Sequence, residues 1–247
     1  MKRIILPAVA VLLLLAACKK ETEQLSSTPL EDYAPLQVGK FIVYQLDTFK
    51  YLPFSLQDTT ISYQVRYLAD ALITDNLGRP AYRINRYIRK TAQQPWTPEN
   101  TSLAINTGNS LEYVENNLRF LKLRAPVKDG FSWKGNSYID TYSLNSGVRY
   151  MDDWDYTYEG VNTPLTLGSF QLDSTIKVNQ RDEIIGNPED PNSYSEKNIS
   201  AEIYAKGIGL VYRQFLHTEY QPATPGGPGA SYTDDSYGIT LTMIEHN

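Results

Sequence analysis

Residues 61–74 carry the clearest structural pattern of the chain and read Ile61-Ser62-Tyr63-Gln64-Val65-Arg66-Tyr67-Leu68-Ala69-Asp70-Ala71-Leu72-Ile73-Thr74. Successive side chains of an extended chain point to opposite faces, so polar and apolar residues that alternate are typical of a half-buried β-strand. The face that we expect to be buried holds Ile61, Tyr63, Val65, Tyr67, Ala69, Ala71 and Ile73.

Turn-forming residues follow this strand at positions 75–80, where Gly78 is free to adopt positive φ. The chain then returns through Tyr82, Ile84 and Ile88, so residues 61–91 are predicted to form one long hairpin. A second hairpin is predicted over residues 111–124, turning at positions 115–117. Strand patterns also occur at 40–46, 154–159, 170–180, 210–220 and 238–244.

Helical patterns are weak throughout the chain, and loops are indicated at 93–98, 186–192 and 221–229. Strands that arrive in adjacent hairpins favour an antiparallel sheet, and so many long strands leave exposed edges unless the sheet curls or stacks. The sequence therefore predicts an all-β fold with little helix. We expect a strongly curved antiparallel sheet, either an open barrel or a sandwich, as one domain over residues 34–247.

The amino end has the features of an export signal. Met1-Lys2-Arg3 is positively charged, and residues 4–17 form an apolar run that is too short to span a bilayer. The run ends in Leu15-Ala16-Ala17-Cys18, which resembles the lipobox of bacterial lipoproteins. This resemblance implies that residues 1–17 are a signal peptide and that Cys18 is the lipid attachment site, carrying fatty acyl chains such as palmitate.

Cys18 is the single cysteine of the chain, so an internal disulfide is excluded. The polar residues 18–33 are predicted to form a flexible tether. Position 19 is not an aspartate, and the Lys19-Lys20-Glu21 that follows Cys18 resembles the export signals of Bacteroidota lipoproteins. This resemblance implies the outer membrane, with the periplasmic or surface face left open. The net charge of −5 argues against nucleic acid as a partner, and the sequence predicts neither a cofactor nor a metal.

Three phrases resemble those of Bacteroidota-type outer-membrane lipoproteins of unknown function. They occur in order along the chain and read Tyr33-Ala34-Pro35-Leu36-Gln37-Val38-Gly39-Lys40-Phe41-Ile42-Val43-Tyr44, Pro126-Val127-Lys128-Asp129-Gly130-Phe131-Ser132-Trp133 and Tyr204-Ala205-Lys206-Gly207-Ile208-Gly209-Leu210-Val211-Tyr212-Arg213. The resemblance implies a cell-envelope lipoprotein with a curved antiparallel sheet, and it implies no particular activity.

Carboxylates and aromatic rings interleave around residue 155, and the candidate ligand-binding residues are Asp153, Trp154, Asp155, Tyr156 and Tyr158. Aromatic rings that stack on sugars beside carboxylates would suit a glycan or a peptide, and paired carboxylates can hydrolyse glycosides. Strand alternation offers a simpler interpretation, in which the rings are buried and the carboxylates face solvent. No residue is predicted to be catalytic.

Two other groups of side chains are candidates for a site. His217 could serve a metal or a triad, although its place in a strand favours a structural role. Arg83, Asn85, Tyr87 and Arg89 share one face of the return strand, where they could line an anion-accepting groove or simply form a solvated surface.

These observations leave three functions open. The first is a non-enzymatic binding module for an envelope protein or a glycan, and it requires exposed aromatic side chains. The second is a LolA-like carrier of lipid or lipoprotein, which requires an apolar cavity within the sheet. The third is a glycan hydrolase that uses the acids of residues 152–159, which requires two carboxylates in one cleft.

Overall fold

The computed structural model describes residues 28–52 and 55–247. The predicted signal peptide, Cys18 and most of the predicted tether lie outside these residues. The helices of the described part are two single turns, η1 (Leu30–Asp32) and η2 (Arg149–Met151). Neither is long and apolar enough to cross a membrane.

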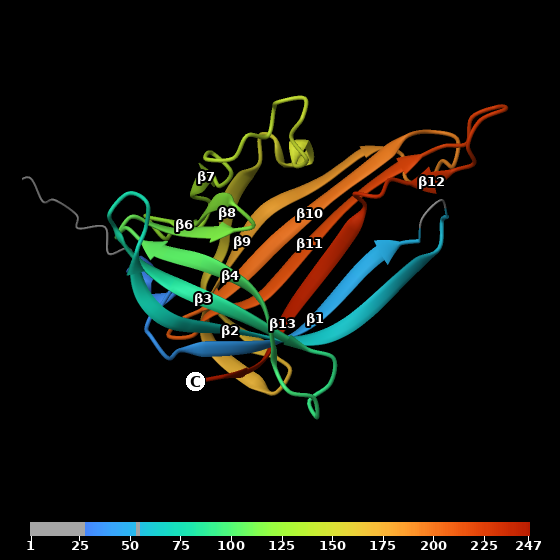
Figure 1. Ribbon diagram of the computed structural model, residues 1–247. Coiled ribbons are helices and arrows are strands. Elements are labelled where there is room, and N and C mark those ends of the chain that lie inside the picture. Colours follow the sequence, from blue (N-terminus) through green and yellow to red (C-terminus); the bar gives the residue numbers. More distant parts are fainter. Residues whose placement is uncertain (1–27, 53–54) are drawn as a thin grey trace, which may run out of the picture.

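All thirteen strands in the described part belong to one antiparallel sheet (Figure 1). Their order across the sheet is β6-β5-β4-β3-β2-β1-β13-β11-β10-β9-β8-β7, and β12 pairs with β11 outside this path. The strands are β1 (Phe41–Tyr51), β2 (Asp58–Thr74), β3 (Pro80–Arg89), β4 (Thr97–Asn106), β5 (Ser110–Glu115), β6 (Leu118–Arg124), β7 (Ser132–Lys134), β8 (Asp155–Leu167), β9 (Phe170–Gly186), β10 (Ser195–Ala205), β11 (Gly209–Gln221), β12 (Ser231–Tyr232) and β13 (Tyr237–His246).

Both predicted hairpins are confirmed as β2–β3 and β5–β6. Asp75 closes the first turn, because its carboxylate accepts hydrogen bonds of 2.9 Å from the backbone nitrogens of Leu77 and Arg79. Asn116 and Asn117 form the second turn with φ values of 51° and 64°, a conformation that asparagine tolerates. The five other predicted strands correspond to β1, β8, β9, β11 and β13. The strands β4 and β10 and the short strands β7 and β12 were not predicted.

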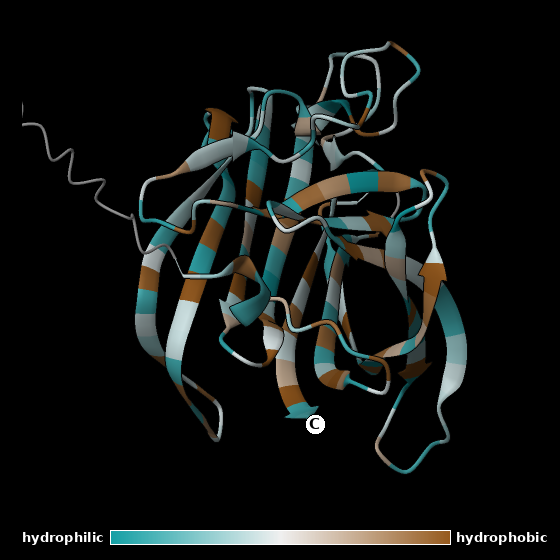
Figure 2. Cartoon of the chain, turned by 90° about the vertical axis from the view of Figure 1, so that its left-hand side faces the viewer, coloured by the Kyte–Doolittle hydropathy of each residue, from teal (hydrophilic) through white to brown (hydrophobic). Residues whose placement is uncertain are grey.

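The alternation that predicted β2 holds only as far as Ala69. The pairing of β2 with β3 shifts between Ala69 and Ala71, which places Ala71 opposite the exposed Arg83. Such a bulge bends and twists a strand, and this one helps the sheet to curve. The strands in Figure 2 carry the brown and teal bands that alternation produces.

The sheet curls until its two edges meet, so that it forms a nearly closed barrel. The Leu121 nitrogen on β6 donates a hydrogen bond of 2.8 Å to the Gly135 oxygen, one residue beyond β7. The Trp133 indole donates to the Leu121 oxygen at 2.7 Å. The Tyr158 hydroxyl, on β8, donates to the Arg124 oxygen and accepts from the Arg124 nitrogen, both at 2.8 Å. The predicted strongly curved sheet is therefore confirmed, as an open barrel.

The last residues of the predicted tether pack against the barrel. Thr28 forms a β-bridge with Val127, and the side chains of Leu30 and Tyr33 are buried. The Gly207 nitrogen donates a hydrogen bond of 2.7 Å to the Asp32 oxygen. Residues 28–33, which the sequence places in the predicted tether, are thus held against the barrel by this bridge and by two buried side chains.

Candidate functional site

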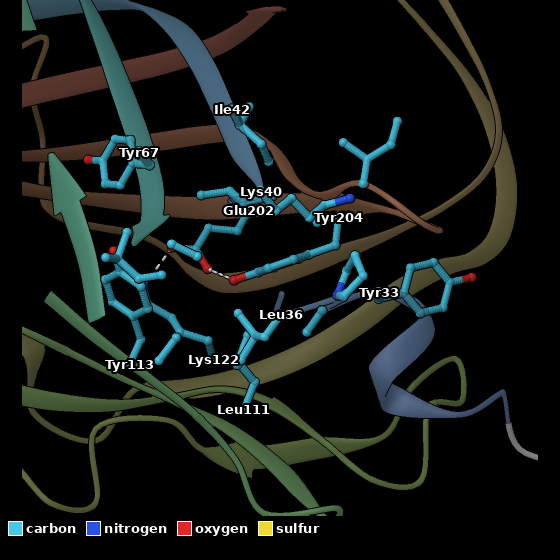
Figure 3. A pocket seen from close by; sticks show the side chains of 18 of the residues that line it. Tyr33, Leu36, Lys40, Ile42, Tyr67, Leu111, Tyr113, Lys122, Glu202 and Tyr204 are labelled. Atoms are coloured by element: carbon cyan, nitrogen blue, oxygen red, sulfur yellow. Dashed lines mark hydrogen bonds and ion pairs between the residues drawn. The ribbon is translucent and has the colours of Figure 1, made fainter. Parts of the chain in front are cut away.

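A cavity of about 140 Å³ lies inside the barrel (Figure 3). The segment of residues 33–42 covers one side of it, and inward-facing side chains of the surrounding strands form the rest. Most of the wall is apolar or aromatic and is formed by Tyr33, Ala34, Pro35, Leu36, Phe41, Ile42, Tyr44, Tyr67, Ala69, Ile84, Ala104, Leu111, Tyr113, Tyr204, Ile208, Leu210 and Leu241. Such a lining suits hydrocarbon.

The cavity reaches the surface beside the amino-terminal segment. Its lining includes the exposed Gln37 and the half-buried Lys40, whose ammonium donates a hydrogen bond of 2.8 Å to the Gly207 oxygen. Val38, next to this opening, is also exposed. The opening is thus formed by the part of the chain that leads toward Cys18.

The opposite end of the cavity is charged. The Lys122 ammonium lies 2.6 Å from one oxygen of the Glu202 carboxylate, and the other oxygen accepts a hydrogen bond of 2.7 Å from the Tyr204 hydroxyl (Figure 3). Arg213 stands 3.6 Å from Glu202 and 3.3 Å from Glu115. These charges come from β5, β6, β10 and β11, so the cluster joins opposite walls of the barrel.

Burial controls the charge states around the cavity. Desolvation lowers the pKa of Lys122. Desolvation also opposes ionisation of Glu202, but the charges of Lys122 and Arg213 outweigh it and hold the pKa of that carboxyl below its ordinary value. Burial raises the pKa of Tyr67 to about 12, so its hydroxyl is neutral at physiological pH. The cavity therefore combines apolar walls with neutral and charged hydrogen-bonding groups at one end.

The structure does not bring the five predicted ligand-binding residues together. The rings of Trp154, Tyr156 and Tyr158 are at most 2 % exposed and belong to the core. The carboxylates of Asp153 and Asp155 lie on the surface, where both bind Lys134 at 2.5 and 3.1 Å. Alternation along β8 separates Asp155 from the rings of Tyr156 and Tyr158, whereas Asp153 lies in the turn before this strand with a φ of 55°. Neither acid lines the barrel cavity. The five side chains offer no common surface to a glycan.

His217 is also part of the packing. Its Nδ1 lies 2.8 Å from the Asn198 side-chain oxygen, and its ring stacks on Tyr150 with 3.8 Å between centroids. Burial lowers the pKa of His217. Within residues 28–52 and 55–247, no group of three histidine, cysteine or acidic side chains is placed to hold a metal ion.

The charged end of the cavity was missed at the level of sequence. Lys122 stands in the apolar run Phe120-Leu121-Lys122-Leu123, and Glu202 stands between Ala201 and Ile203. A charged residue within an apolar strand is the signal that could have found each of them. Their pairing could not be found in this way, because it depends on how the sheet closes.

No protein-family model matches the chain, and no curated protein matches it either.

Proposed function

We propose that this protein is a lipid-anchored cell-envelope protein whose barrel binds a small amphiphilic molecule. The observation that carries the proposal is the cavity of about 140 Å³, apolar along its walls and charged at the end that holds Lys122, Glu202 and Arg213. An apolar tail would be stabilised by the walls, and a polar group by the cluster.

The size of the cavity limits the ligand. An engineered apolar cavity of about 150 Å³ is known to accept benzene, whereas complete drug-sized ligands occupy pockets of roughly 300–1,000 Å³. The cavity thus suits a single short tail or ring rather than the several acyl chains of a lipoprotein. The proposal keeps the apolar cavity of the LolA-like alternative but assigns it a smaller cargo.

The anchor is the sequence-based part of the proposal. It rests on the lipobox-like Leu15-Ala16-Ala17-Cys18 and on the resemblance to outer-membrane lipoproteins. The chain between Cys18 and Thr28 can span at most about 35 Å when fully extended. The segment that leads to Cys18 also borders the cavity opening, so an acylated Cys18 would hold the opening close to the lipid from which an amphiphile would come.

The test compares cavity-filling variants in the mature chain from residue 18, carrying Cys18→Ser so that no detergent is needed. Ala104 lines the cavity and is 2 % exposed, so Ala104→Phe should occupy the space that a ligand would use. Mass spectrometry of extracted ligand and titration with the apolar fluorophore 1-N-phenylnaphthylamine measure occupancy. We expect wild type to bind the probe and Ala104→Phe to lose most of this binding.

The matched control is Ala71→Leu, an apolar enlargement on β2 opposite the exposed Arg83, away from the cavity. It should bind the probe as wild type does. Ala69→Leu, inside the cavity, provides a second filling variant if Ala104→Phe unfolds. The proposal would be contradicted if wild type did not bind the probe, or if wild type, Ala104→Phe and Ala69→Leu all bound it equally.

A second function is favoured by three exposed hydrophobic side chains in the loop between β7 and η2. Tyr138 is 61 % exposed, Tyr142 76 % and Leu144 85 %. Exposed tyrosines are typical of binding surfaces, and these two meet the requirement of the binding-module hypothesis. The loop would bind an envelope protein or a glycan independently of the cavity.

Crosslinking in cells tests this second function. Tyr138→Ala combined with Tyr142→Ala should remove the crosslinked partner without changing the thermal midpoint, because both side chains are exposed. Tyr194→Ala, an exposed tyrosine on another loop, is the control. Retention of the partner by the double variant would exclude the loop as the binding surface.

A further inference from the structure

The outer face of β2 and β3 carries a basic aromatic strip, which we define as Arg66, Tyr87, Arg89 and Trp96. Arg66 lies directly opposite Tyr87 in the pairing of the two strands. Its guanidinium carbon is 4.8 Å from the Tyr87 ring centroid and 5.3 Å from that of Trp96. The guanidinium carbon of Arg89 is 4.1 Å from the same Trp96 ring. Two cations therefore share one indole ring.

Neither arginine of the strip has an acidic partner within the described part of the chain. Nearby arginines do, since Arg83 pairs with Asp70 at 2.5 Å and Arg86 with Glu99 at 3.0 Å. Arg89 donates from Nε to the neutral Gln64 side chain at 2.8 Å. The Nε of Arg66 is buried without any hydrogen-bond partner among the described residues.

Stacking on the aromatic rings does not supply hydrogen-bond acceptors for the two guanidinium groups. Stacking on Trp96 and Tyr87 holds both side chains in place, but it leaves N–H donors along their edges without acceptors. Two like charges on one ring also repel each other, and an anion between them would turn this repulsion into attraction. A chain with a net charge of −5 contains enough carboxylates to neutralise the strip, yet those of Asp70 and Glu99 pair with Arg83 and Arg86 instead.

We infer that the basic aromatic strip is a binding site for a phosphate group. Guanidinium groups recognise phosphate through paired N–H donors, and pre-ordered side chains lose little entropy when they bind it. The phosphate would belong either to a lipid headgroup or to a soluble phosphate ester. This site is independent of the barrel cavity, because its residues lie on the face of β2 and β3 opposite to Tyr67 and Ile84, which line that cavity.

Fluorescence of Trp96 can test the site in the full-length protein. The chain has three tryptophans, of which Trp133 and Trp154 are buried, so a neutral quencher reports mainly on Trp96. One arm titrates glycerol 1-phosphate into protein held in phosphatidylcholine vesicles. The other compares acrylamide quenching in these vesicles with quenching in vesicles that also contain phosphatidylglycerol. We expect a response in at least one arm, and the arm that responds identifies the source of the phosphate.

The variant Arg66→Gln with Arg89→Gln should weaken the response by roughly tenfold or more, since each arginine contributes charge-assisted hydrogen bonds. The control is Arg83→Gln, which removes a cation from the same strand and face but one already paired with Asp70. It should leave the response unchanged. Arg89→Gln alone serves if the double variant does not fold. No response of wild type in either arm, or an undiminished response in the variants, overturns the inference.

Discussion

The ammonium of Lys122 lies 2.6 Å from the carboxylate of Glu202, and the two residues are 80 positions apart in the chain. Their side chains are 6 % and 1 % exposed, so the ion pair crosses the interior of the barrel between β6 and β10. A buried pair of this kind adds little net stability compared with apolar packing, but loss of one partner leaves the other as a buried charge. The pair thus ties the edge strand β6 to the far wall.

Removal of both partners should therefore cost less than the two single removals added together. We expect Lys122→Met to lower the free energy of unfolding by about 3 kcal/mol. We expect Lys122→Met combined with Glu202→Gln to lower it by less than the sum of the single changes, as measured by urea unfolding. The exposed pair of Arg83 and Asp70 is the control, and its loss should cost much less, because solvent screens the two charges. Strictly additive costs would contradict this account of the pair.

Tyr158 should hold the seam of the barrel closed. Its hydroxyl makes two hydrogen bonds to the backbone of Arg124, and Tyr158→Phe leaves both backbone groups without this partner. The expected loss is about 1–3 kcal/mol in the free energy of unfolding, with faster amide exchange in β6. Tyr82→Phe is a suitable comparison, because Tyr82 packs against the core without a role at the seam. Unchanged exchange in β6 would show that the seam does not depend on this hydroxyl.

The stability of the protein should decrease on mild acidification because of His217. Burial lowers the pKa of this imidazole, although Glu196 and Asp235 act in the opposite direction. The unfolded chain binds a proton near the ordinary value of 6.5, whereas the folded protein resists it. The contribution of His217 to the free energy of unfolding is thus fully present above pH 6.5, and it declines as pH falls toward the lower pKa of the folded state.

Thermal midpoints at pH 7.5, 6.5 and 5.5 measure this effect, with about 2–4 °C expected for each kcal/mol lost. His217→Gln removes the titrating group and retains a polar side chain beside Asn198. Its midpoint should change less over the same range. Equal slopes for the variant and wild type would assign the acid sensitivity to other groups.

The alternation of residue types predicted the fold well, because it records which face of a strand is buried. It predicted β2 as far as Ala69, and it separated Trp154, Tyr156 and Tyr158 from the acids beside them. It failed for β4 and β10, which begin with the polar stretches Thr97-Pro98-Glu99-Asn100-Thr101 and Ser195-Glu196-Lys197-Asn198. Their apolar side chains come only in the second half of each strand.

The cavity could not be predicted in the same way. Its charged end brings together Glu115, Lys122, Glu202 and Arg213 from four strands, and these residues meet only because the sheet closes. The basic aromatic strip could not be predicted from the sequence either. The sequence pattern placed Tyr87 and Arg89 on one face, but Arg66 and Trp96 reach them from a neighbouring strand and a loop. Local periodicity contains no information about such contacts.

Close packing at the seam leaves no room for a side chain at Gly135. A Cβ atom at this position would lie 2.3 Å from the ring of Tyr156, which is 1 % exposed and cannot move aside. Gly135→Ala should therefore lower the free energy of unfolding by about 1–3 kcal/mol. The same substitution at Gly147 is the matched control, since a Cβ there meets no atom within 4 Å. It should be neutral, or stabilising by up to about 1 kcal/mol.

A double-mutant cycle separates this steric cause from a general preference for glycine. In the background Tyr156→Leu the aromatic ring is absent, so Gly135→Ala should cost much less than it does in wild type. Because Gly135 also accepts the hydrogen bond from Leu121 that joins β6 to the end of β7, relief of the clash should restore slow amide exchange at Leu121. An alanine that remains equally costly without the ring would mean that backbone conformation, and not the approach of Tyr156, requires glycine at this point of the seam.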